Sequence, residues 1–196
     1  MEQLTGNSRI GEVIEASTTA FRVQSYKLYD TPPLGSFIKT GSLPIFAIVC
    51  KITTEPLDPT RPIIARGEFA SSEEQLYKEH PQLSRLLTSR FEALIVGHGD
   101  GQQINQHLPS MPPQVHSFVA VCSNDEIINF SNNLDFVHLL LNSGSFATEE
   151  IVLACMNKVI QAQPSQSEFR IKIGRALARE LSSDVRQLTS ILRSLA

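Results

Sequence analysis

Side chains suited to metal binding or acid–base chemistry are spread thinly over the middle of the sequence. They are His98, Asp100, His107, His116, Cys122 and His138. Protein zinc sites usually bring ligands in close pairs such as Cys-x-x-Cys or His-x-x-x-His, and the sequence contains no such pair. The nearest pair, His98 and Asp100, falls in the glycine-rich segment Gly97–Gly101, where we expect a solvated turn. We therefore expect no metal ion and no cofactor.

Two combinations of residues resemble nucleophilic sites. Ser36–Lys39 matches the Ser-x-x-Lys acylation motif, which places its serine at the start of a helix. Here the motif lies in a predicted strand, where residues three apart point to opposite faces. Cys122 and His116 form the second combination, and their spacing does not support catalysis. We expect no catalytic residue; an enzyme stays a third hypothesis, which requires a deep pocket lined by His98, Asp100 or Cys122.

Basic side chains gather only near the C-terminal end. The net charge of −3 does not fit a generally basic nucleic-acid-binding protein, but residues 164–196 hold 6 Lys+Arg against 3 Asp+Glu. On a helix, Lys172, Arg175 and Arg179 would share one side, which we call the basic face. Such a face could bind phosphate, or it could simply be the solvated side of an amphipathic helix. No aromatic residue is interleaved among the three, which argues against single-strand binding.

Cysteine usage and hydropathy indicate the compartment. The odd number of distant cysteines (Cys50, Cys122 and Cys155) favours buried thiols in a reducing compartment over a disulfide framework. The segment Met1–Thr5 lacks the basic and apolar regions of a signal peptide. No apolar run approaches the ~20 residues needed to cross a bilayer. We expect a cytoplasmic protein with no membrane partner, and its 41% hydrophobic residues suffice for a sizeable core.

The first half of the chain has the pattern of short strands separated by turns. Alternation over Ile10–Ala16 and Ala20–Tyr26 predicts a hairpin. The turn Pro32–Gly35 leads into a strand at Ser36–Thr40. The apolar run that opens Ile45–Thr54 predicts a strand buried on both faces.

Two more strands complete the predicted set, at Ile63–Phe69 and Phe91–Val96. Between them we expect a short helical stretch that begins with a capping box from Ser71 to Glu74. Together these segments predict a small β-barrel of about six strands over residues 8–101. The Gln- and Pro-containing residues 102–114 are interpreted as a linker.

Several of these segments resemble the HerA–ATP synthase barrel, a small β-barrel that heads DNA-translocating ATPases and the catalytic subunits of rotary ATP synthases. The likeness lies in Ile10–Ile14, Phe21–Val23, Pro33–Ile38 and Ile45–Val49, and it extends diffusely over residues 8–125. Barrels of this family pack side by side and order the subunits of a ring, so the resemblance implies assembly. ATP hydrolysis is not implied, because the Gly-x-x-x-x-Gly-Lys-Ser/Thr loop of the ATPase domain is missing from the sequence.

The region of residues 115–196 is predicted to be mainly helical after one strand at Val115–Cys122. We expect a helical segment at Leu134–Leu141 and longer helices at Glu149–Gln163, with Thr148 as N-cap, and at Glu168–Leu195. In the last helix, apolar residues recur at alternating steps of three and four, as in a coiled coil. This interaction seam comprises Leu181, Val185, Leu188, Leu192 and Leu195.

The sequence thus predicts an α+β protein with an N-terminal barrel at residues 8–101 and a strand plus helices at residues 115–196. Our first hypothesis for its function is a non-catalytic assembly or interaction protein, a homo-oligomer or the binder of a protein partner. The second is a nucleic-acid-associated accessory factor of a separate translocase or ATPase, acting through the basic face. The seam can equally be an ordinary core-packing stripe, and the barrel can be a generic one of the same strand count.

Overall fold

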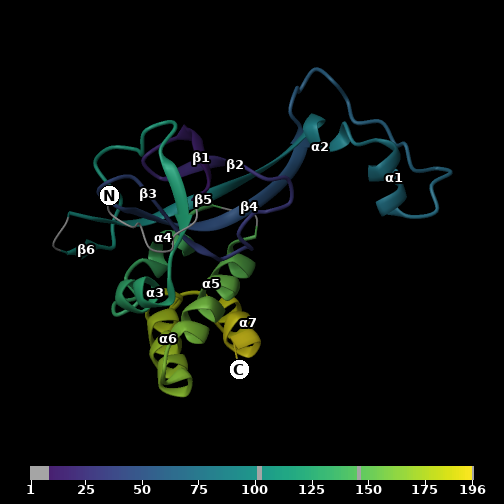
Figure 1. Cartoon of the computed structure of the whole chain (residues 1–196). Helices are drawn as coiled ribbons and strands as arrows, with labels where there is room; N and C mark the ends of the chain where they lie inside the picture. The colour runs from purple at the N-terminus through teal and green to yellow at the C-terminus, as the bar shows by residue number, and fades with distance from the viewer. Residues whose placement is uncertain (1–8, 101–102, 145–146, 196) are drawn as a thin grey trace.

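The computed structural model describes residues 9–100, 103–144 and 147–195, and within these ranges seven antiparallel strands make one sheet (Figure 1). The strands are β1 (Arg9–Ala16), β2 (Ala20–Ser25), β3 (Phe37–Thr40), β4 (Ile45–Pro56), β5 (Leu87–Gly99), β6 (Ile104–Asn105) and β7 (Phe118–Val121). Their order is β2-β1-β7-β3-β4-β5-β6, and β2 also pairs with β5. Six strands therefore follow one another in a ring of pairings, the strand ring, and β6 is added beside β5.

The β1–β2 hairpin forms where the sequence predicts it. Val13 pairs with Val23, and both are fully buried, together with Phe21. Arg22 lies between Phe21 and Val23 and points to the other face, as the two-residue period of a strand requires. In the connecting turn, the Ser17 hydroxyl accepts a hydrogen bond from the Ala20 amide at 3.1 Å.

Strand β4 is buried on both faces over its first half, which confirms the prediction from its apolar run. Ala47 and Val49 belong to a core cluster whose buried members come from all six strands of the ring. Phe46 and Ile48 face the other way, into a second cluster shared with the helices. A continuous apolar run is needed here because neither face of this strand meets water.

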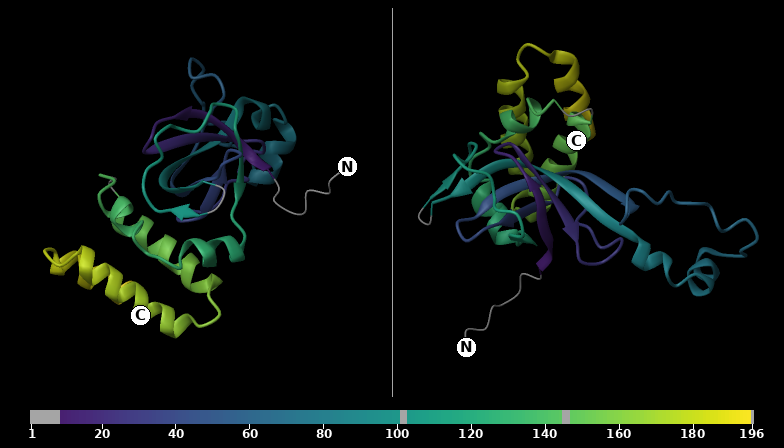
Figure 2. Two further views of the ribbon diagram at one scale, coloured as in Figure 1. Left: turned by 90° about the vertical axis from the view of Figure 1, so that its left-hand side faces the viewer. Right: turned by 90° about the horizontal axis from the view of Figure 1, so that it is seen from above.

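Helices cover one side of the strand ring and form a helical layer (Figure 2, left). They are α3 (Asn124–Phe130), α4 (Val137–Leu141), α5 (Thr148–Ala162), α6 (Gln166–Glu180) and α7 (Val185–Leu195). Helix α5 is central, since it contacts α3, α4, α6 and α7 and buries Val152, Cys155 and Met156. Among the described helices, none combines the length and the apolar character that a bilayer span requires.

The connection between β4 and β5 projects away from the rest of the molecule (Figures 1 and 2). This arm, residues 57–86, contains the short helices α1 (Glu73–Glu79) and α2 (Leu83–Leu86). The prediction of a strand at Ile63–Phe69 is wrong, because these residues have no regular secondary structure and are exposed. The expected cap is also shifted by one residue, because Ser72, not Ser71, accepts from the backbone amide of Gln75.

The glycine-rich segment does not begin a turn at Gly97. Strand β5 continues to Gly99, and Gly97 pairs with Phe46 while Gly99 pairs with Ile104. A side chain at position 97 would meet the Asn105 carbonyl oxygen at 2.5 Å, so the close approach of β6 requires glycine there. Residue 101, the last of the predicted turn, lies outside the described residues.

Residues 103–114 are more than a linker. They include β6, and the Gln106 side chain binds three backbone groups of the helical layer: it donates to the carbonyl oxygens of Phe130 (2.6 Å) and Asn133 (2.9 Å) and accepts from the Phe136 amide (3.0 Å). Farther along, β7 pairs with both β1 and β3. The sheet therefore extends past residue 101, the expected end of the barrel.

The long C-terminal helix expected at Glu168–Leu195 is two helices. Helix α6 ends at Glu180 with Leu181 as its C-cap, and α7 begins at Val185. The Asp184 carboxylate accepts a hydrogen bond from the Gln187 amide at 3.0 Å, which is the contact of an N-cap residue. Polar residues 182–184 therefore break the helix inside the predicted seam.

Candidate functional site

The histidines and their acidic neighbours make structural contacts. His98 Nδ1 donates to the His107 carbonyl oxygen at 3.3 Å, and the two rings pack edge to face with centroids 4.8 Å apart. His116 Nδ1 donates to the Glu12 carboxylate at 3.1 Å. Asp100 accepts from the Gln103 amide at 2.8 Å. Among the residues described, no group of three or more His, Cys, Asp or Glu side chains could hold a metal ion.

The cysteines are held as thiols. The pKa of Cys122 is raised to about 12, mainly by burial and also by the nearby Glu126 carboxylate, while Lys39 opposes the shift. Burial also raises the pKa of the half-buried Cys50 to about 11 and that of the fully buried Cys155 well above its usual range. A thiolate is the nucleophilic form of cysteine, so none of these side chains is poised to attack near neutral pH.

The Ser36–Lys39 motif is used for packing. Ser36 is buried, and its carbonyl oxygen accepts from the Val49 amide at 3.0 Å. Lys39 forms an ion pair with Glu126, which also completes the capping box of α3 with Ser123. The lysine therefore links β3 to the start of the helical layer.

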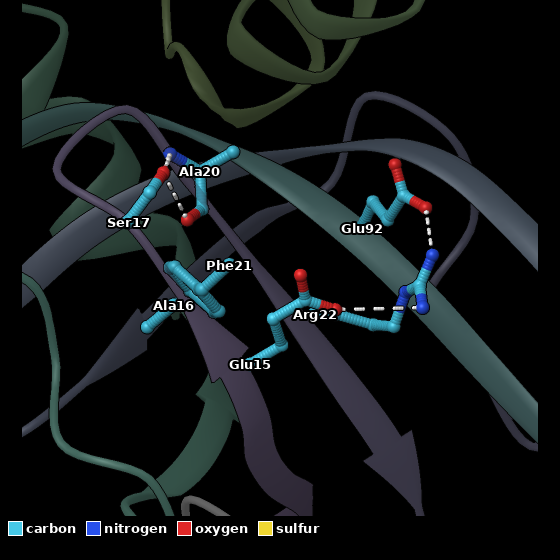
Figure 3. Close-up of a pocket in the computed structure, with 7 residues that line it drawn as sticks. All are labelled: Glu15, Ala16, Ser17, Ala20, Phe21, Arg22 and Glu92. Carbon is cyan, nitrogen blue, oxygen red and sulfur yellow. Dashed lines mark hydrogen bonds and ion pairs between the residues drawn. The ribbon is translucent and has the colours of Figure 1, made fainter.

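A row of charges crosses four strands on the outer face of the strand ring. Figure 3 shows three of its members, Glu15, Arg22 and Glu92. Arg22 of β2 lies 3.5 Å from Glu15 of β1 and 2.9 Å from Glu92 of β5, and Glu92 is also 3.3 Å from Lys51 of β4. The hydrogen bond from Arg22 lowers the pKa of Glu92 and raises that of Arg22. A hollow of about 210 Å³ lies here, and the charged groups that line it, Glu15, Arg22 and Glu92, are paired across strands, as expected of a row that keeps strands in register.

The predicted basic face is on α6, and two of its three members are engaged within the chain. Lys172 donates to the Asn132 carbonyl oxygen at 2.6 Å and lies over the Phe169 ring. Arg179 forms ion pairs with Asp135 and Glu180 at 3.3 and 3.4 Å. Arg175 is exposed. Cations already paired with carboxylates and carbonyls have less to offer a phosphate backbone.

The predicted interaction seam does not form one stripe, because its members lie on two helices. Leu181 and Leu195 are buried in the core, and Leu188 is half-buried against it. Val185 and Leu192 are exposed at 67% and 36%. The spacing therefore reflects core packing at its two ends rather than a coiled-coil surface.

Exposed large apolar side chains are concentrated on the arm. Here Leu57, Ile63, Ile64 and Leu86 are 44–67% exposed, and Phe69 is 92% exposed. These five are among the sixteen large hydrophobic side chains that the described residues leave exposed, and they lie on a segment of about one sixth of the chain. This density makes the arm a candidate interaction surface, because monomeric proteins seldom expose contiguous apolar patches.

Part of this surface is a groove of about 430 Å³ along the base of the arm. Its apolar lining is supplied by Leu57, Ile63, Ile64, Leu76, Leu83 and Leu86. Three arginines, Arg61, Arg66 and Arg85, also line it, against one acid, Asp58, which pairs with Arg61 at 3.4 Å. Tyr29 and Tyr77 share a hydrogen bond of 2.8 Å that ties the arm to the loop after β2. The arrangement is an apolar trough with a positive rim.

The arm was missed as a site because Ile63–Phe69 was interpreted as a barrel strand. Two signals were present: the prolines at positions 59 and 62 stand shortly before the run, and Ile63 and Ile64 are adjacent apolar residues without alternation.

Compared with known proteins, the chain matches no protein-family model, and no curated protein matches it either.

Proposed function

We propose that this chain is a non-catalytic assembly protein in which a small barrel, similar to the HerA–ATP synthase barrel, carries an apolar arm that binds protein. One observation carries the proposal: the arm holds Ile63, Ile64 and Phe69 at 60–92% exposure while the remainder of the fold has two well-packed cores. Leaving such side chains in water costs free energy, about 1.5–3 kcal/mol for each large residue that could be buried, and a binding partner recovers it.

The barrel part of the proposal is supported by the ring of pairings and by a core cluster drawn from all six ring strands. Two of the segments that carry the family likeness lie in the sheet or lead into it: Gly11 lies in β1, and Leu34-Gly35 forms the turn before β3. Barrels of that family act as subunit-ordering modules, so an assembly role fits a chain whose strand ring resembles such a barrel and whose sequence has no phosphate-binding loop.

The experiment is a measurement of molar mass in solution by sedimentation equilibrium over two decades of protein concentration, together with an affinity capture from native extract. The matched variant is Ile63→Asp with Ile64→Asp, which changes exposed residues and should leave the unfolding temperature unchanged. We expect concentration-dependent association, or a captured partner, that the variant abolishes. A wild-type chain that stays monomeric and captures nothing, or a variant that associates as wild type does, contradicts the proposal.

A further inference from the structure

The most exposed large apolar side chain lies on the arm, outside the groove. Phe69 is 92% exposed and is not among the residues that line the groove of its own chain. A benzyl side chain has a large apolar area and few rotamers to lose, so it is well suited to be the anchor of an interface. The groove, at about 430 Å³, lies within the volume range of small-molecule pockets, roughly 300–1,000 Å³, so it has room for a benzyl group. The arm thus carries both an unfilled apolar trough and an unburied apolar anchor.

The charges beside these two features are opposite. Glu68 directly precedes the anchor in the chain, Glu73 and Glu74 open α1 a few residues after it, and all three side chains are exposed. Around the groove stand Arg66 and Arg85, also exposed. Within the described part of the chain, no ion pair joins these five side chains to one another. Acidic groups flanking the anchor would therefore meet the positive rim if the anchor entered a groove.

We propose that the arm pairs with the arm of a second copy of this chain: Phe69 of each copy inserts into the groove of the other, and the acidic residues beside it face Arg66 and Arg85 there. The contact is self-complementary, so a two-fold axis satisfies both grooves at once. This inference deepens the proposed function and rests on it, because it names the partner and the residues of the same surface.

The first test compares the dimer dissociation constants of the full chain and of Phe69→Ala. A two-fold interface contains the contact twice, and burying each phenylalanine strengthens the association constant roughly tenfold or more. The substitution should therefore raise the dimer dissociation constant by on the order of 100-fold or more. The control is Met111→Ala, which removes another large and mostly exposed apolar side chain, 70% exposed, outside the arm. Unchanged association in Phe69→Ala, or an equal loss in Met111→Ala, would overturn the inference.

The second test exchanges the charges. One variant carries Arg66→Glu with Arg85→Glu, and the other carries Glu68→Arg with Glu73→Arg. In a homodimer of either variant, the anchor of each copy would meet a groove of like charge, so each variant alone should stay monomeric. Mixed in equal amounts, they offer an acidic anchor for a basic groove and a basic anchor for an acidic groove, so a heterodimer should form. Failure of the mixture to associate while each variant stays folded refutes the pairing.

The outcomes also separate this inference from the proposed function. If the chain associates and neither Phe69→Ala nor the charge exchange affects it, the assembly role stands and the pairing of arms is wrong. If the chain alone stays monomeric and a different protein is captured through Ile63 and Ile64, the second copy is wrong as the occupant while the binding role of the arm stands.

Discussion

The junction between the strand ring and the helical layer can be tested at Gly35, which precedes β3. Its amide donates to the Val49 carbonyl oxygen at 2.9 Å, and its φ is +76°. A Cβ atom there would lie 2.5 Å from backbone atoms of Ala154 and Cys155 in α5. Backbone of a central helix cannot move aside as the end of a flexible side chain can, so Gly35→Ala should push the turn away from α5.

The magnitude follows from two costs. A positive φ costs a non-glycine residue about 1–2 kcal/mol, and forced overpacking typically costs about 1–3 kcal/mol. Gly35→Ala should therefore lower the free energy of unfolding by about 2–5 kcal/mol. Gly144 is the matched control, because its φ is +68° and nothing lies within 4 Å of its Cβ position. Gly144→Ala should incur only the first cost.

Urea denaturation of the two variants and the wild type, followed by circular dichroism, measures the difference directly. We expect Gly35→Ala to be less stable than Gly144→Ala by about 1–3 kcal/mol, the overpacking cost alone. Equal losses in the two variants would refute the reasoning, since they would mean that the approach of the turn to α5 carries no steric cost.

Three further predictions concern the polar groups of the fold. Gln106→Ala should lower the free energy of unfolding by about 1–3 kcal/mol, measured by urea denaturation, because it leaves backbone groups of the helical layer without their side-chain partner; no loss would contradict this. The pKa of Glu92 is lowered from 4.5 in the folded state, so the stability it contributes is present above that pH and is lost as the pH falls through the folded value. Urea midpoints between neutral and acidic pH should therefore fall less steeply in Glu92→Gln than in the wild type, and parallel curves would count against the row of charges. Thiol reagents should modify Cys50 and Cys122 slowly near neutral pH and faster as the pH rises toward their pKa values of about 11 and 12, whereas the urea-unfolded chain should react at once.

The local sequence pattern was sufficient to predict strands in two cases: where one face of the strand is exposed to water, and where both faces are buried. The alternation of Ala20–Ser25 and the unbroken apolar run at the start of β4 both predicted the observed strands. In both cases the order of polar and apolar residues matches which side chains are buried. The short helices of the arm and the helix at α5 were also predicted. The first residue of α5 was displaced by one, since Ala147 rather than Thr148 occupies the N-cap position.

The remaining misses depended on partners distant in the sequence. Gly97 lies in a strand that β6 approaches closely. The glycines around it in the sequence indicate a turn and give no sign of that contact. The break before α7 had a local signal, Asp184 three residues ahead of Gln187, but the apolar spacing across it was regular enough to mask it. The candidate site was missed for a related reason: the apolar run from Ile63 has the composition of a buried strand, and only its surroundings show that it is exposed.

The position of β7 sets the order in which the chain can fold. Its two neighbours are β1 and β3, and residue pairs such as Gly11 with Val119 are more than one hundred positions apart. During synthesis, β1 and β3 leave the ribosome with open edges and keep them until the chain past Val121 has emerged, so the nascent protein exposes strand edges that could pair wrongly. A truncation at residue 101 is expected to yield an aggregation-prone fragment rather than an independent barrel.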